Sequence, residues 1–202
     1  MTKLNPIVIV LTSVIFSGCA SANIPFFGKK SDQAETTTAS DESLLVANEF
    51  VKKGRIVNRA RLQQRQNVII IPFHAGVDVE ATDDLDRIAL MMIKGITDTF
   101  GADQTGKHDH FHILTADSQE PDNLVLKGYF TDLSGPSTLK RLLPLTNKQS
   151  LGVSGKLMDA KSGEVLVIFT DAVTTDDKND DTMKLGYQIG INIGRFLLSG
   201  VD

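Results

Sequence analysis

The stretch that decides the fold reads Leu151-Gly-Val-Ser-Gly-Lys-Leu-Met-Asp-Ala-Lys-Ser-Gly-Glu-Val-Leu-Val-Ile-Phe-Thr170. Large and small residues alternate as far as Met158, which is typical of a strand. A second strand-like run returns from Glu164 to Thr170. Between them, Asp159 can cap a tight turn and Gly163 can supply the positive φ that such a turn requires. The stretch therefore predicts an antiparallel hairpin.

The segments upstream of this hairpin predict a strand, a helix and two further strands. An uninterrupted apolar run, Val68-Ile-Ile-Ile-Pro-Phe73, is typical of a buried strand. Thr82 is expected to cap a helix that has acidic residues in its first turn and ends at Gly101. Strands are predicted at Phe111–Leu114 and Leu124–Phe130. The apolar stripe of the helix consists of Leu85, Ile88, Ala89, Met92, Ile96 and Phe100.

A last helix is predicted from about Asp180 to Leu198. Its apolar face uses Leu185, Ile189, Ile193, Phe196 and Leu197. Because the first strand, first helix and second strand follow one another through short connections, we expect a parallel crossover there. The expected fold class is α/β (α+β), with a single mixed sheet and two main helices. We place this globular domain at residues 67–202.

Several of these segments together resemble a family of bacterial envelope lipoproteins of unknown function. The resemblance is carried by Leu124-Val-Leu-Lys-Gly-Tyr-Phe-Thr-Asp132, Arg141, Ser150, the stretch from Leu157 to Leu166, and Leu185-Gly-Tyr-Gln-Ile-Gly190. That family is similar to the curli-secretion lipoprotein, to lipoprotein activators of penicillin-binding proteins, and to the amino-terminal domain of the Tol-system propeller protein. The resemblance covers about residues 67–198 and implies an α/β sandwich like that of anticodon-binding domains.

The amino-terminal residues predict a lipid anchor. A short basic start and a ten-residue apolar run, Ile7 to Phe16, precede Ser17-Gly18-Cys19, which contains the only cysteine of the chain. The run is too short to span a bilayer, which takes about 20 residues. We interpret residues 1–18 as a lipoprotein signal peptide and residues 19–42 as a lipidated, polar, flexible tether. An ordinary signal cleaved after Ala20-Ser21-Ala22 is the alternative.

By resemblance to known lipoproteins, the Ala20 that follows the cysteine implies the periplasmic face of the outer membrane rather than the inner membrane. The net charge of −4 and the absence of tryptophan disfavour nucleic-acid and carbohydrate binding. We expect no cofactor and no nucleic-acid partner.

Residues 43–66 are predicted to form a basic amphipathic helical segment. Its cations are Lys52, Lys53, Arg55, Arg59, Arg61 and Arg65. One interpretation is a solvated helix face. The other is a surface that meets anionic headgroups, lipopolysaccharide or an acidic partner.

Two further patterns suggest sites. His108, His110 and His112 occupy alternate positions, so their three imidazoles could lie on one face of a strand and bind a metal ion. The simpler interpretation is the polar start of a strand, where His112 is half-buried and the other two are solvated. Gly186, Gly190 and Gly194 recur every four residues on the last helix. Glycine in a helix costs about 1 kcal/mol relative to alanine, so this stripe predicts either close internal packing or a groove for another subunit.

No nucleophile elbow, phosphate loop or Cys/His pair is recognised in the sequence, so we expect no enzyme. The leading hypothesis is a lipid-anchored periplasmic module of the outer membrane that binds an unidentified envelope protein. The alternatives are a self-assembling ring subunit of a secretion or flagellar complex, and a metal-binding protein that uses the histidine cluster.

Overall fold

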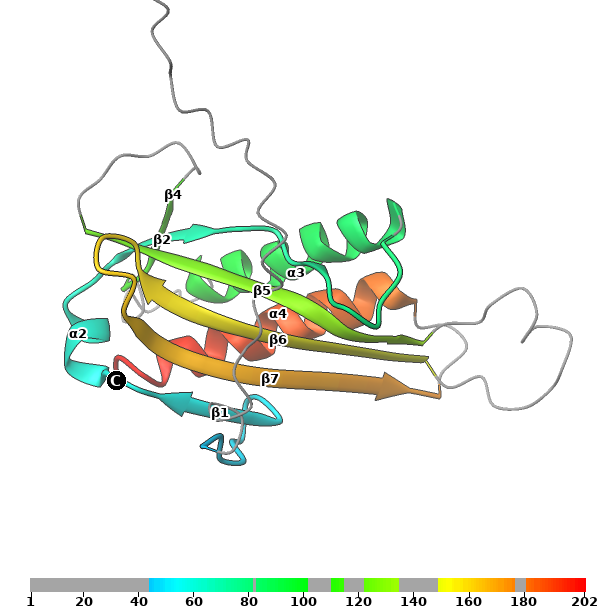
Figure 1. Ribbon diagram of the computed structural model, residues 1–202, viewed down its shortest axis with the longest axis horizontal. Helices are drawn as coiled ribbons and strands as arrows, with labels where there is room; N and C mark the ends of the chain where they lie inside the picture. Colours follow the sequence, from blue (N-terminus) through cyan, green and yellow to red (C-terminus); the bar gives the residue numbers. More distant parts are fainter. Residues whose placement is uncertain (1–43, 82, 102–109, 115–121, 135–148, 177–180) are drawn as a thin grey trace, which may run out of the picture. The chain divides into compact units, whose positions relative to one another are not determined.

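The predicted hairpin lies within a seven-stranded mixed sheet in the computed structural model, with a single strand, β1 (Lys53–Ile56), beyond it on one side (Figure 1). The structure describes residues 44–81, 83–101, 110–114, 122–134, 149–176 and 181–202. The two hairpin strands are β6 (Gln149–Asp159) and β7 (Val165–Thr175), and they pair antiparallel. Gly163 has a φ of 72°, as the turn requires. The hairpin prediction is therefore confirmed.

The sheet combines an antiparallel half with a parallel half. Its strand order is β1-β7-β6-β5-β2-β4, and β3 pairs with β5. The antiparallel half adds β5 (Asn123–Ser134) and β1 (Lys53–Ile56) to the two sides of the hairpin. The parallel half consists of β2 (Asn67–Ile70), β3 (His74–Ala75) and β4 (His112–Leu114). The predicted mixed α/β fold class is thus confirmed.

The predicted strand Val68–Phe73 is divided in two. β2 ends at Ile70, and pairing with β5 resumes only at His74. Pro72, which lacks a backbone N–H, lies between the two paired stretches and cannot donate to the ladder. Phe73 turns into the core with 3% of its surface exposed.

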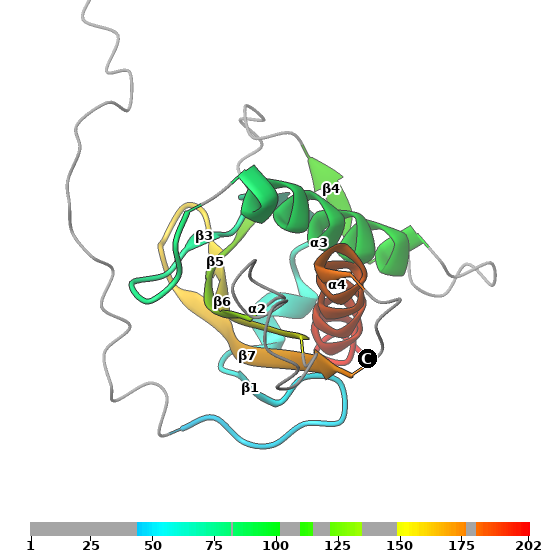
Figure 2. The same cartoon turned by 90° about the vertical axis from the view of Figure 1, so that its right-hand side faces the viewer.

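Both predicted long helices are present and pack on one side of the sheet (Figure 2). They are α3 (Asp83–Gly101) and α4 (Thr182–Leu198). All residues of the two predicted apolar faces are buried, which confirms both stripes. The side chain of Asp181 caps α4 by accepting the backbone N–H of Lys184 at 2.9 Å. The predicted cap Thr82 lies outside the described residues.

Glycines on the strands make room for the aromatic core beneath the helices. A Cβ on Gly54 would lie 2.4 Å from the ring of Phe196, and one on Gly155 would lie 2.6 Å from the ring of Phe169. These two rings stand edge to face, with centroids 6.5 Å apart. Bare backbone at these positions therefore lets large rings lie directly against the sheet.

The prediction of a helical segment over residues 43–66 is wrong. Val46 forms a bridge with Gly54, β1 follows, and the only helix described there is the five-residue α2 (Arg59–Gln63). Gly54 disfavours a helix, and β1 gains its hydrogen bonds by pairing with β7. Leu62 is fully buried and Val51 is 2% exposed in the same core as the helices. The folded unit therefore begins before residue 67, the boundary expected from the sequence.

In the described part of the chain, no helix is both long enough and apolar enough to cross a bilayer.

Candidate docking surfaces

One face of the sheet is covered by α3 and α4, while no helix among the described residues covers the other, which we call the open face (Figure 2). Side chains alternate between the faces along each strand. On β5, Leu124, Leu126 and Phe130 point toward the helices and are fully buried. Lys127 and Tyr129, which lie between them in the sequence, point to the open face and are half-buried.

The strand register places three basic residues and one isoleucine in a single row on the open face. Arg55 on β1 lies opposite Ile168 on β7, Ile168 lies opposite Lys156 on β6, and Lys156 lies opposite Lys127 on β5. We call these four residues the basic row. Neighbouring strands are about 4.8 Å apart, so the row extends over roughly 14 Å. Lys127 and Lys156 are directly opposite, an arrangement in which like charges repel.

The basic row has different neighbours on its two sides. One side carries an apolar row across four strands, formed by Met158, Val125, Ile69 and Leu114. The other side carries a mostly polar row, formed by Lys53, Thr170, Ser154, Tyr129 and His74. The open face thus carries apolar, cationic and polar rows in parallel, in which Ile69 is 7% and Ser154 is 4% exposed.

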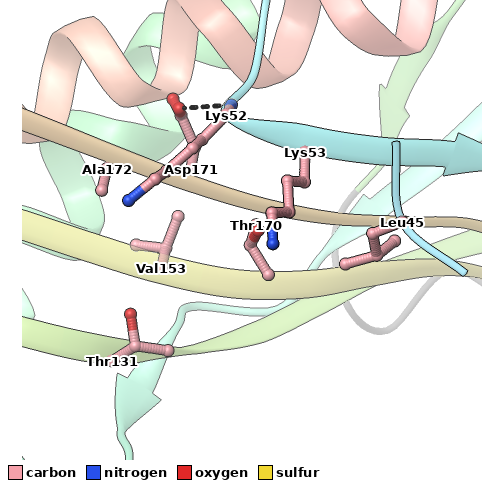
Figure 3. Close-up of a pocket in the computed structure, with 8 residues that line it drawn as sticks. All are labelled: Leu45, Lys52, Lys53, Thr131, Val153, Thr170, Asp171 and Ala172. Carbon is pink, nitrogen blue, oxygen red and sulfur yellow. Dashed lines mark hydrogen bonds between the residues drawn. The ribbon is translucent and has the colours of Figure 1, made fainter. Parts of the chain in front are cut away.

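A pocket lies where β1 meets the open face (Figure 3). It is lined by Leu45, Lys52, Lys53, Thr131, Val153, Thr170, Asp171 and Ala172. The carboxylate of Asp171 accepts the backbone N–H of Lys52 at 3.0 Å and the side-chain amide of Asn192 on α4 at 2.9 Å. Asp171 therefore serves to hold β1 and α4 together. The side chains of Lys52 and Lys53 extend over β7 and add two cations beside the basic row.

The predicted basic residues of 43–66 serve two different purposes. Lys52, Lys53, Arg55 and Arg59 are exposed. In contrast, Arg61 and Arg65 form ion pairs with Asp159 in the turn between β6 and β7, with N–O distances of 3.2 and 2.9 Å. Arg61 and Arg65 thus fasten the segment around α2 to the hairpin, and the partner-binding role of the six cations stays a prediction.

Asp159 is the centre of this attachment and is only 1% exposed. Its Oδ1 accepts the backbone N–H groups of Lys161 and Ser162 and the hydroxyl of Ser162. Burial acts to raise the pKa of Asp159, but the hydrogen bonds from Ser162 and Arg61 outweigh it and hold the pKa well below its ordinary value. The group is therefore a buried, fully ionised structural carboxylate.

The glycine stripe on α4 packs against α3 of the same chain. A Cβ on Gly190 would lie 2.1 Å from the carbonyl oxygen of Met92, and one on Gly186 would lie 2.9 Å from the side chain of Ile88. A Cβ on Gly194 would meet the side chain of Thr99 at 2.7 Å. Internal packing, one of the two predicted interpretations, is confirmed. The groove for another subunit is already filled by α3.

Two of the three histidines of the predicted metal cluster belong to the described residues. His108 lies outside the described residues, His110 is half-buried, and His112 is exposed at the start of β4. Within the described ranges, no group of three or more His, Cys, Asp or Glu side chains is placed to hold a metal ion. His74 lies opposite Tyr129 in the middle of β5, whereas His112 is level with Asn123 at the start of β5.

The helix-covered side of the molecule forms a second surface. On it, Lys94 and Asp98 form an ion pair at 2.6 Å, and the hydroxyl of Tyr187 donates to the same carboxylate at 2.9 Å. These hydrogen bonds lower the pKa of Asp98, chiefly the one from Lys94. Leu90 on α3 is 61% exposed. A nearby groove is lined by Met91, Val173, Thr174, Thr175, Lys184, Leu185, Tyr187 and Gln188.

No protein-family model matches the chain, and neither does any curated protein sequence. Solved structures similar to it include a PelC dodecamer from Paraburkholderia phytofirmans, at 13% identity and a TM-score of 0.45, covering 72% of this chain and 91% of that one. A Xanthomonas campestris protein of the family DUF330 is 9% identical, with a TM-score of 0.43 and coverages of 67% and 84%. A lipoprotein from Neisseria meningitidis is 11% identical, with a TM-score of 0.36 and coverages of 65% and 97%.

Bacterial lipoproteins are thus among the structural neighbours. At TM-scores below 0.5, these similarities assign neither a family nor a function. The likeness to the curli-secretion, penicillin-binding-protein activator and Tol proteins stays a prediction.

Sequence reasoning missed two parts of these surfaces. Lys127 and Lys156 are 29 residues apart in the chain, and only the register of β5 with β6 brings them together. Gly95 on α3 faces Gly190 on α4, with 3.1 Å between a Cβ on Gly95 and the Cα of Gly190. In the sequence, the only sign of this close contact was that Gly95 is a glycine inside the apolar stripe of α3.

Proposed function

We propose that the protein is a lipid-anchored, non-enzymatic module that binds another envelope protein at the periplasmic face of the outer membrane. The observation that carries this proposal is that the folded unit has two different surfaces on opposite sides of its sheet. One side is a sheet face with ordered basic and apolar rows, and the other is a helical side with exposed Leu90 and a groove. Such a module can hold two envelope components at once.

The anchor part of the proposal is supported by the sequence around Cys19. The thiol follows an apolar run and a glycine, and a polar stretch separates it from the folded unit. Cys19→Ala should release the protein from the membrane fraction and abolish incorporation of labelled palmitate, because the acceptor thiol is lost. Ser21→Ala, which keeps the thiol, should stay membrane-bound and labelled. Release of both variants, or of neither, would contradict the anchor.

The protein-binding part is tested by crosslinking in intact cells. A photoreactive amino acid at Gln188, which is exposed in the groove on the helical side, should yield one dominant adduct with a different protein. The adducts are identified by mass spectrometry. Adducts with the chain itself alone would favour the ring subunit instead. No adduct from Gln188 or from Leu90 would contradict a partner on the helical side.

The alternative of a self-assembling ring subunit was suggested by a groove along the glycine stripe. In the structure, α3 of the same chain packs against this stripe. The metal alternative rests on His108, His110 and His112, of which only the last two are described.

A further inference from the structure

We infer that the open face of the sheet docks on the anionic surface of the membrane that holds the anchor. This inference rests on the proposed lipid anchor and adds to it a fixed orientation of the folded unit. The occupant would be the phosphate-bearing headgroups of the bilayer, rather than an acidic segment of another protein.

The first argument is the charge of the open face. Arg55, Lys156 and Lys127 share the basic row, and Lys52 and Lys53 lie beside it at the pocket. The whole chain has a net charge of −4, so this row of cations does not simply reflect a basic overall composition. Anionic headgroups attract such clusters of lysine and arginine.

The second argument is the apolar material beside these cations. Val57, which follows β1, is 46% exposed, and Ile71, which follows β2, is 38% exposed. The apolar row through Met158 and Val125 lies next to the basic row on the same face. Surfaces that lie at a membrane interface combine cations for the headgroups with apolar groups for the acyl boundary. A surface for an acidic peptide alone would not need the apolar band.

The third argument is the position of β1 in the sequence. Val46 pairs with Gly54, which lies between Lys53 and Arg55 in β1. In the sequence, this basic edge belongs to the first part of the folded unit after the proposed anchor at Cys19. An anchor at Cys19 would therefore bring this edge to the bilayer ahead of the rest of the folded unit.

This orientation has a consequence for the partner protein. α3 and α4 cover the opposite side of the sheet, so docking of the open face would turn Leu90 and the groove around Gln188 toward the periplasm. The two surfaces would then have separate tasks.

Each lysine or arginine near an anionic membrane strengthens binding by about fivefold. Neutralising two exposed cations, Lys53→Gln with Arg55→Gln, should therefore lower the ratio of docked to undocked molecules by about 25-fold. The matched control is Arg87→Gln with Arg195→Gln, which removes the same charge from exposed positions on α3 and α4. The control should leave the ratio unchanged.

The experiment uses the lipidated full chain reconstituted into vesicles of phosphatidylcholine, with or without phosphatidylglycerol. A fluorophore is attached at Ala172→Cys on the open face, or at Leu90→Cys on the helical side. Lipids with a nitroxide on the headgroup act as quenchers. We expect quenching at position 172 in vesicles that contain phosphatidylglycerol, its loss in pure phosphatidylcholine or at high salt, and no quenching at position 90.

Equal quenching at the two positions, quenching in pure phosphatidylcholine, or none in either vesicle would overturn the inference. Equal effects of the two double variants would do the same. The anchor is checked separately, because a lipidated protein floats with pure phosphatidylcholine vesicles. If the protein floats but is not quenched at position 172, the docking inference alone is contradicted. If the protein does not float, the proposed anchor is contradicted.

Discussion

Substituting Gly190 by alanine probes the contact that sets the spacing of α3 and α4. The new Cβ would lie 2.1 Å from the carbonyl oxygen of Met92 and 3.1 Å from the Cα of Gly95. Both are backbone atoms, so relief requires movement of a whole helix rather than a rotamer change. Overpacking of this kind costs about 1–3 kcal/mol, and the better helix propensity of alanine returns about 1 kcal/mol. We expect a net loss of up to about 2 kcal/mol.

The assay is thermal and urea unfolding of the purified protein. A loss of this size lowers the Tm by up to roughly 8 °C in a domain of this length. Gly101→Ala is the matched control, because nothing lies within 4 Å of its added Cβ at the end of α3. The control should be as stable as the parent or slightly more stable. If Gly190→Ala gained as much stability as Gly101→Ala, the reasoning about helix spacing would be refuted.

Three further predictions concern other parts of the fold. Asp159→Asn should destabilise by about 2–3 kcal/mol, because it removes the charge that Arg61 and Arg65 share. Because the folded-state pKa of Asp159 lies below its ordinary value, the parent should keep this contribution above about pH 5 and lose it as the pH falls below about 4. Urea unfolding at pH 7 and pH 3 checks this, and an unchanged difference between parent and variant would contradict it. Leu62→Ala should cost about 2–5 kcal/mol by urea unfolding, because Leu62 is fully buried; a neutral result would place α2 outside the core. His108→Ala with His110→Ala should change stability by less than about 1 kcal/mol. Micromolar Zn²⁺ binding by calorimetry that this double variant loses would instead support the metal alternative.

The helices and the hairpin could be predicted because their signals are local. The stripe from Leu85 to Phe100 repeats at helical spacing within one segment, and Asp159 and Gly163 mark a turn within five residues. β1 gave no comparable signal. It is four residues long, and its one buried position is a glycine, Gly54. The alternation of apolar and polar side chains that usually marks a strand is therefore missing from its sequence. Its stability comes from pairing with β7, more than 100 residues away.

The candidate surfaces were predicted only in part for the same reason. The cations at residues 52–65 were visible in the sequence, but their division between an ion-pair cluster and the open face depends on the position of Asp159. The spacing of the stripe Gly186, Gly190 and Gly194 was visible as well. Whether it faced α3 or a second subunit depended on Met92 and Gly95, which are contributed by a distant segment.

The proposal that Cys19 anchors this module is tested most directly by mass spectrometry of the amino-terminal peptide of the protein isolated from membranes. The account predicts a peptide that begins at Cys19 and carries a thioether-linked diacylglyceryl group and an amide-linked acyl chain. An unmodified peptide beginning at Asn23, after Ala20-Ser21-Ala22, would indicate an ordinary secretory signal and would contradict the account.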